Sequence, residues 1–154
     1  MFALLTPNAF FSEAMSHLLI AFICGGIVGL DRQLRGKPVG LRPCMIVVLT
    51  TTLLVDIGNV ATEGAGDPSR MMSAIVTGVG FLGGGVILSH GGEVRGITTA
   101  ALIWALAAVG IVIGLGFGLT ALAFTLIIKA MMLSVDLIEY QFPRLRRRSE
   151  AERD

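Results

Sequence analysis

Uncharged apolar runs, separated by short polar segments, make up most of this chain. Each run is close to the length of about 20 residues that a membrane-spanning helix needs. The breaks between the runs predict five helices, over residues 12–30, 43–60, 68–88, 98–113 and 119–135. The pattern is therefore typical of an all-α, polytopic membrane helix bundle.

The last two helices are predicted from a single run, residues 97–135, in which Lys129 is the one charged residue. As one helix this run would be about 58 Å long, roughly twice the thickness of a bilayer core. We therefore expect the chain to turn back within the segment that contains Gly110, Gly114, Gly116 and Gly118.

Composition agrees with a membrane protein. Of the 154 residues, 54% are hydrophobic and 15% are charged, which is too apolar for a soluble domain of this size. The net charge of +1 gives no sign of a nucleic-acid partner, and we expect none. Cys24 and Cys44 lie in or beside apolar runs without metal-ligand spacing, so we interpret them as small buried residues.

The distribution of charge predicts the orientation of the bundle. Residues 31–42 are strongly basic, residues 63–67 are acidic, and residues 136–154 contain a cluster of arginines. Because cytoplasmic loops are enriched in Lys and Arg, this order predicts an outside amino terminus and a cytoplasmic carboxy terminus. We divide the chain into a transmembrane domain, residues 12–135, and a short charged cytoplasmic tail, residues 136–154.

Glycine is concentrated between residues 78 and 96. Gly78, Gly80 and Gly83 match the G-x-G-x-x-G pattern of dinucleotide-binding loops. That pattern functions where a strand leads into a helix, whereas these glycines lie inside a helix that Asp67 and Pro68 are predicted to begin. We therefore interpret them as small residues that let two helices approach closely.

Small residues recur in the other spans as well, and the same interpretation applies there. We expect Gly84→Leu to disrupt helix packing or dimerisation, because bulk at a close crossing separates the backbones. The predicted helix-packing residues are Gly25, Gly29, Gly78, Gly80, Gly83, Gly84, Gly85, Gly110, Gly114 and Gly118.

Asp56 and His17 are the ionisable residues of the predicted spans that we consider as candidate sites. Asp56 is near the outer end of the second span, where it either pairs with Arg70 or coordinates an ion, and we favour the pairing. His17 is one turn from Glu13. A pairing of these two residues and a proton relay at His17 are both possible, and we favour the pairing. Asp56 is thus the candidate metal ligand. No cofactor is predicted, and binding of Mg²⁺ stays open.

Four ordered segments have the character of family motifs: GLDRQLRGKPVGLR at residues 29–42, DPSR at 67–70, GFLGGGVI at 80–87 and VRGITTAALIW at 94–104. Together they resemble the MgtC/SapB family of bacterial inner-membrane proteins. The polar residues that the resemblance marks are Asp31, Arg32, Arg35, Arg42, Asp67, Arg70, Arg95, Thr98 and Thr99.

The resemblance implies a multi-pass protein of the bacterial inner (plasma) membrane. The family is linked to growth at low magnesium, to stress adaptation and, in pathogens, to survival inside host cells. Its best-known member is thought to restrain the F-type ATP synthase, which makes that complex an implied partner. That member carries a soluble carboxy-terminal domain, so this chain, with its short tail, is expected to be nearer the SapB-like or YhiD-like branch.

Two classes of function follow. A regulatory protein would dock through its small-residue faces onto itself, most simply as a dimer, or onto another membrane complex. A magnesium or proton transporter would need oxygen ligands in its spans, which offer Asp56 and, at an end, Asp31. We favour the regulator. We expect no enzyme, since no catalytic constellation has suitable spacing.

The basic segment after the first helix has two compatible interpretations. It anchors the protein to lipid headgroups on the cytoplasmic side. Alternatively, Asp31 pairs with an arginine and locks helix ends, which leaves the other arginines to engage an acidic partner or a phosphate.

Overall fold

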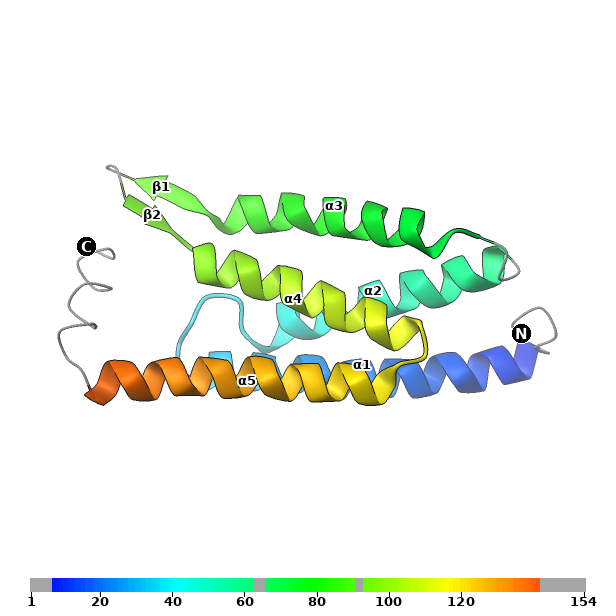
Figure 1. Cartoon of the computed structure of the whole chain (residues 1–154), viewed down its shortest axis with the longest axis horizontal. Helices are drawn as coiled ribbons and strands as arrows, with labels where there is room; N and C mark the ends of the chain where they lie inside the picture. The colour runs from blue at the N-terminus through cyan, green and yellow to red at the C-terminus, as the bar shows by residue number, and fades with distance from the viewer. Residues whose placement is uncertain (1–6, 63–65, 91–92, 142–154) are drawn as a thin grey trace.

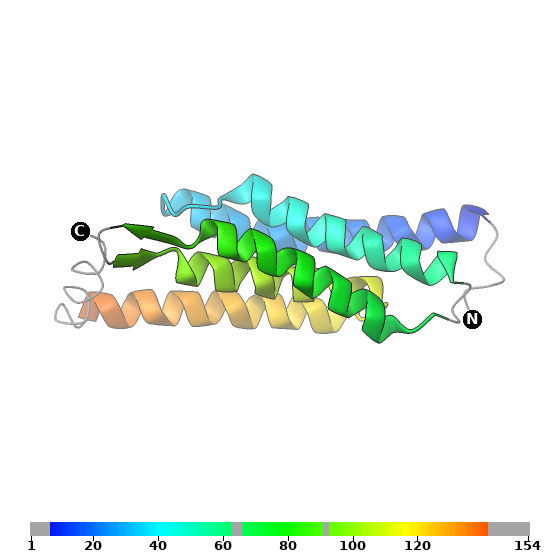
Figure 2. The same ribbon diagram turned by 90° about the horizontal axis from the view of Figure 1, so that it is seen from above.

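The computed structural model describes residues 7–62, 66–90 and 93–141. These residues form five α-helices and one β-hairpin: α1 (Pro7–Leu34), α2 (Leu41–Ala61), α3 (Pro68–Val86), β1 (Leu88–His90), β2 (Glu93–Arg95), α4 (Ile97–Gly114) and α5 (Gly118–Gln141). The helices run along one long axis and alternate in direction (Figures 1 and 2). The predicted all-α bundle is confirmed, with a small hairpin added to it.

The bundle has two ends with different polar residues (Figure 1). We call one the hairpin end; it contains the last turn of α1, the β-hairpin, the first turn of α4 and the last turns of α5. We call the other the far end; it contains the first turns of α1, the end of α2, the start of α3 and the α4–α5 turn.

Helix α4 forms the centre of the bundle and contacts each of the other four helices. It carries no charged side chain and is apolar around its whole circumference, and it is the most buried of the four helices that are long and apolar enough to cross a membrane. Leu106, Val109 and Ile113 of α4 are fully buried and share one cluster with Val28 of α1 and Val48 of α2.

Glycines bring α2 into close contact with both α1 and α4. A Cβ atom on Gly25 of α1 would lie 2.8 Å from the Cα atom of Met45. A Cβ atom on Gly110 of α4 would lie 1.8 Å from Thr51 Oγ1. These two crossings exist only because glycine has no side chain, in agreement with the sequence prediction. Further predicted glycines with similarly close neighbours are Gly29, Gly114 and Gly118.

The glycines of α3 behave differently, and here the structure corrects the prediction. A Cβ atom on Gly78, Gly80, Gly84 or Gly85 would meet no heavy atom of another described element within 4 Å. Gly83 makes ordinary contact with Ala100, at 3.7 Å. The glycine-rich stretch therefore does not set a helix–helix distance within this chain, because most of it faces outward.

Several predicted element ends agree with the structure. The carboxylate of Asp67 accepts a hydrogen bond from the Ser69 amide at 2.9 Å, so Asp67 is the N-cap of α3 and Pro68 follows it. The chain turns between α4 and α5 at Gly116, whose φ of +87° suits glycine. The predicted break in the long apolar run is thus confirmed.

Other ends lie further along the chain than predicted. Helix α1 continues past Leu30 to Leu34, and α5 continues past Val135 to Gln141, so Asp136 belongs to a helix. The apolar pattern indicates where the hydrophobic region ends, whereas a helix can extend beyond it with charged residues. The tail that was predicted to begin at Asp136 has its arginines in residues 142–154, which lie outside the described residues.

The segment between the predicted third and fourth helices forms an antiparallel hairpin. Leu88 lies opposite Arg95, and His90 lies opposite Glu93. Two adjacent glycines between short segments are a recognised signal for a tight hairpin, and Gly91-Gly92 stands at that place in the sequence.

Four of the described helices are long and apolar enough to cross a membrane, over Phe10–Leu34, Leu41–Ala61, Ile97–Gly114 and Gly118–Ile138. Helix α3 lies alongside α4 (Figures 1 and 2) but is not among these four. Its glycines, its hydroxyl residues and Arg70 lower its hydropathy. The fifth span stays a prediction.

Candidate functional site

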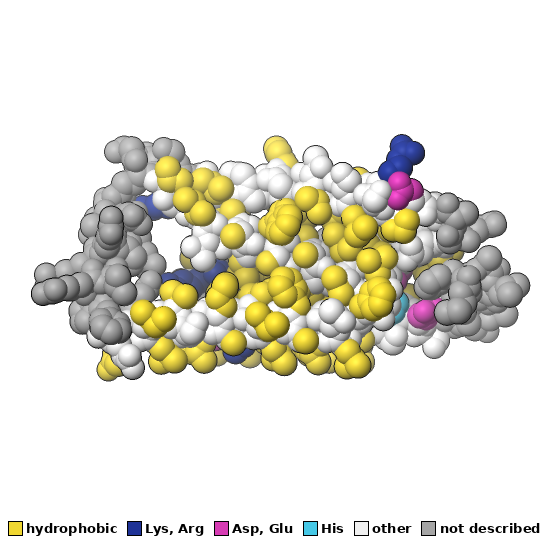
Figure 3. Space-filling view, in the orientation of Figure 1, with side chains coloured by type: hydrophobic (Ala, Val, Ile, Leu, Met, Phe, Trp, Pro, Cys, Tyr) yellow, Lys and Arg dark blue, Asp and Glu magenta, His cyan; other side chains and the backbone are white. Residues whose placement is uncertain are grey.

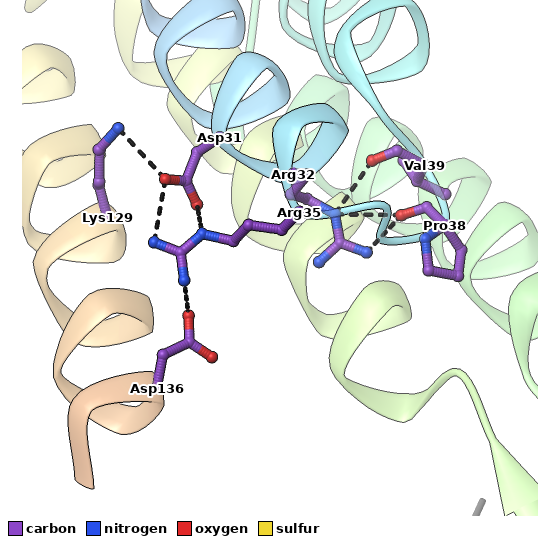
Figure 4. A network of polar contacts seen from close by, with 7 residues as sticks. All are labelled: Asp31, Arg32, Arg35, Pro38, Val39, Lys129 and Asp136. Carbon is purple, nitrogen blue, oxygen red and sulfur yellow. Dashed lines mark hydrogen bonds and ion pairs between the residues drawn. The ribbon is translucent and has the colours of Figure 1, made fainter. Parts of the chain in front are cut away.

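Charged side chains connect α1 to α5 at the hairpin end (Figure 4). Arg35 Nε lies 3.0 Å from Asp31 Oδ2, one turn earlier on α1, and Arg35 Nη1 donates to the carboxylate of Asp136 on α5. Lys129 Nζ, also on α5, lies 3.5 Å from Asp31 Oδ1. Two cations and two carboxylates therefore balance one another. The predicted pairing of Asp31 with an arginine is confirmed.

Arg32 points away from this network, toward the segment that joins α1 to α2 (Figure 4). It is only 3% exposed. Its Nε atom donates to the carbonyl of Val39 at 3.0 Å, and its Nη2 atom donates to the carbonyl of Pro38. Nη2 also lies 2.9 Å from Thr99 Oγ1, in the first turn of α4. One buried guanidinium thus holds the connecting segment against α4.

The connecting segment carries backbone strain at the residue that Arg32 holds. Val39 has a φ of +58°, which is unusual for a β-branched residue. Such a conformation persists only where the surroundings enforce it. The bond from Arg32 to the Val39 carbonyl, together with the packing of the Val39 side chain on the core, supplies that enforcement.

The main role of these contacts at the hairpin end is structural, because they hold helix ends together. Arg35 and Asp136 have side chains that are 31% and 37% exposed, so their attraction is partly screened and contributes little stability by itself. Arg32, in contrast, is buried, and its hydrogen bonds replace water completely at several atoms. The arrangement fixes the ends of α1, α4 and α5 relative to one another.

The remaining residues that the resemblance marks lie in three places. Arg42, in the first turn of α2, and Arg95, in β2, are exposed near the hairpin end, where an anionic headgroup or an acidic partner could reach them. Thr98 is exposed, whereas Thr99 is buried against Arg32. The pair at the far end, Asp67 and Arg70, is exposed at the start of α3.

The far end contains a contact that sequence reasoning missed. His17 Nδ1 lies 2.8 Å from Asp56 Oδ1, and both side chains are almost fully buried, at 10% and 5% exposure. The structure thus corrects the two predicted pairings, because Asp56 contacts His17 and not Arg70, and His17 turns toward α2 instead of Glu13. The physical reason is packing: α2 makes its most extensive contact with α1 and only a small one with α3.

Among the described residues, no group of three or more His, Cys, Asp or Glu side chains is arranged to hold a metal ion. Two residues of the charged network at the hairpin end, Lys129 and Asp136, were not among the site residues predicted from the sequence. Lys129 had a signal that could have identified it, since it is the one charge in a long apolar run. Asp136 had none, because its partner lies on a different helix.

The sequence of this chain is similar to proteins of one known family. A model of the MgtC family matches residues 18–141. The chain is 42% identical over 112 residues to the protein MgtC of Salmonella typhimurium, covering 73% of this chain and 48% of that protein. It is 36% identical over 128 residues to the protein MgtC of Brucella abortus, covering 80% of this chain and 53% of that protein.

An uncharacterized protein of Haemophilus influenzae is similar at 39% identity over 122 residues, covering 73% of this chain and 51% of the relative. This chain therefore spans about half the length of the curated relatives it matches. No solved structure matches it significantly. The family match covers most of α1 and all of α2 to α5; it includes the charged residues of the hairpin end and Asp56, whereas Glu13 and His17 lie before its first residue. With its membrane-type helices, this chain belongs to the MgtC family.

Proposed function

We propose that this chain is a regulatory protein of the bacterial inner membrane that docks onto another membrane protein during magnesium limitation or stress. It is not an enzyme in this proposal, and its effect depends on helix–helix contact. The observation that carries the proposal is the outward face of α3, which is built from small residues and has no partner among the described helices.

The outward side of α3 carries two pairs of open glycines, Gly80 with Gly84 and Gly78 with Gly85, and the exposed Phe81 lies between the two pairs. The four glycines have open space where a Cβ atom would be, and Phe81 is 83% exposed. The strip over α3 is largely white in Figure 3, because glycines and hydroxyl residues dominate it, whereas apolar side chains cover the lower helices. Next to Gly78, an apolar groove runs between α2 and α3 and is lined by Ile46, Leu54, Ala74 and Leu82.

This face is suited to a transmembrane helix of a partner. In a bilayer, helices associate through small residues that let backbones approach, since lipid tails are as apolar as the side chains. The small-residue faces of α1 and α4 are already used against α2. Only α3 keeps such a face open among the described helices, and Phe81 would insert into the surface of the incoming helix.

The partner is identified here only by class, as a membrane protein with an accessible helix. Resemblance to the family makes the F-type ATP synthase the first complex to test, and a second copy of this chain the next.

We further propose that the hairpin end is cytoplasmic. Residues 31–42 are basic, and Arg42 and Arg95 are exposed at that end. The far end, with Asp67 in its exposed turn, would then face outside. Reporter enzymes fused after residue 62 and after residue 141 would test this orientation. Activity of an exported reporter at the second position would contradict it.

Purification in mild detergent tests the docking proposal. We expect mass spectrometry to identify a membrane partner with the wild type and to show at least a tenfold loss of it with Gly84→Leu. Gly26→Leu is the matched control, because Gly26 on α1 also has no neighbour within 4 Å. Equal partner recovery from both variants would overturn the proposal.

A flux assay in proteoliposomes separates this proposal from transport. The regulator should carry neither magnesium nor protons above the background of empty vesicles. Robust flux that Asp56→Asn abolishes would contradict the regulatory function and support a transporter.

A further inference from the structure

His17 and Asp56 form the most deeply buried pair of ionisable side chains described in this chain. They lie near the far end, and their 2.8 Å contact joins α1 to α2. The partners predicted from the sequence, Glu13 for His17 and Arg70 for Asp56, do not form this contact. The pair also lies apart from the docking face of α3. It is independent of the proposed function.

One atom of the pair is left without a hydrogen bond. Asp56 Oδ2 is buried and has no partner among the described residues, although Oδ1 is bonded to His17. A carboxylate oxygen that is removed from water without a donor is unfavourable. The site therefore disfavours the state in which Asp56 is ionised and His17 is neutral.

Few other charges face the pair. Glu13, one turn before His17 on α1, is the acidic residue in the first turns of that helix. Helix α4 has no Asp, Glu, His, Lys or Arg along its length, and α5 has Lys129 and Asp136 toward the hairpin end. Asp67, the N-cap of α3, and Arg70, in its first turn, are exposed. The negative charge of Glu13 opposes a further negative charge on the pair.

Counting protons shows what the pair can bind. With one proton shared between the imidazole ring nitrogens and the carboxylate, the pair has a net charge of −1. With a second proton it becomes neutral, either as imidazolium and carboxylate or as imidazole and carboxylic acid. Two ionisable groups in such contact titrate as a unit. Burial and Glu13 both favour the neutral form.

We propose that His17 and Asp56 together are a proton-binding site, which takes up one proton from the aqueous phase at the far end. Binding changes the charge of the α1–α2 contact from −1 to zero and strengthens it. Release leaves a charged carboxylate between the two helices, with its Oδ2 atom unpartnered among the described residues. Because α1 and α2 form the most extensive helix pair, this site couples the pH at one membrane face to the packing of the bundle.

Nuclear magnetic resonance of ¹⁵N-histidine in lipid nanodiscs tests the site directly. The chain has two histidines, so His90→Gln assigns the ring signals of His17. Spectra recorded between about pH 5 and about pH 8 cover the range in which an unperturbed histidine changes its charge. In Asp56→Asn the midpoint should move by about one pH unit or more to lower pH, because the amide does not attract an imidazolium. Asp56→Glu should largely preserve the wild-type curve.

Two results would overturn the proposal. One is a His17 ring in the wild type that keeps a single protonation state over the whole range. The other is a midpoint in Asp56→Asn that coincides with that of the wild type. If Asp56→Asn does not fold, Glu13→Gln serves instead, since it leaves the pair intact. That variant should shift the His17 midpoint in the same direction by a smaller amount, and an unchanged midpoint would count against the site.

Discussion

Arg32 is buried although its guanidinium carries a permanent charge, and its burial explains why the hairpin end is ordered. A buried charge is tolerated where hydrogen bonds replace its water. The acceptors here are two carbonyls of the segment between α1 and α2 and one hydroxyl of α4. The same contacts hold Val39 in its strained conformation.

Replacement of Arg32 by alanine should therefore destabilise the protein. The carbonyls of Pro38 and Val39 would lose their donor while partly buried, and we expect a loss of about 3 kcal/mol in the free energy of unfolding. Membrane insertion should be unaffected. Denaturation in detergent measures the loss, with Arg42→Ala as the control, since Arg42 is exposed and should change stability by less than about 0.5 kcal/mol. Equal losses in the two variants would contradict this role.

Asp67 provides a pH-dependent contact at the other end. The amide of Ser69 donates to its carboxylate, and this bond holds the pKa of Asp67 below its ordinary value. A lowered pKa in the folded state means that the stabilisation is present above the pKa of the unfolded chain and is lost as pH falls through the folded pKa. We expect amide exchange at the start of α3 to accelerate over that acidic range.

Hydrogen exchange with mass spectrometry of the segment 67–75 measures this effect. Asp67→Asn keeps a capping side chain that does not titrate there, so its exchange should lack the acidic acceleration after correction for intrinsic rates. If the wild type and Asp67→Asn show the same pH dependence, the carboxylate is not the cause.

At the scale of elements, glycines that stand in similar apolar segments differ in what surrounds them: some lie at close helix crossings and others face open space. Gly110 allows α4 to touch α2, where a Cβ atom would lie 1.8 Å from Thr51 Oγ1 and 2.7 Å from the Val48 carbonyl. Gly80 of α3 has open space around it. The two positions therefore predict different responses to the same substitution.

Gly110→Ala should cost about 1–3 kcal/mol of stability, because the added methyl forces α2 and α4 apart. Gly80→Ala should be neutral or stabilise the protein by about 0.5–1 kcal/mol, because alanine is the better helix former. Thermal unfolding in one detergent compares the two variants. A larger loss for Gly80→Ala than for Gly110→Ala would show that the helix faces are assigned wrongly.

The positions of the helices could be predicted from the sequence better than the packing of one helix against another. The length of each apolar run predicts a helix, and Asp67 and Gly116 mark ends by local chemistry. Which helices pack together depends on contacts between distant parts of the chain. The outward direction of Gly80 and the pairing of His17 with Asp56 are therefore not visible in the sequence, because periodicity indicates a face but not what covers it.

At the scale of the whole molecule, one helix is arranged unlike the others. Helix α4 is enclosed, α1 and α2 are joined by glycine contacts and by the His17–Asp56 pair, and α5 is tied to α1 by ion pairs. Helix α3 contacts mainly α4 and leaves its small-residue face open. The charged lock at the hairpin end and the enclosed core would hold this face in a fixed orientation for a partner.

Site-specific photo-crosslinking in living cells tests the central claim, that the outward face of α3 binds another membrane protein. A photoreactive phenylalanine analogue would replace Phe81 on α3 or, as the control, Phe22 on α1, which is 52% exposed. We predict a discrete protein adduct from position 81 and only lipid adducts from position 22. Lipid adducts alone from both positions, at low and at high magnesium, would contradict the account.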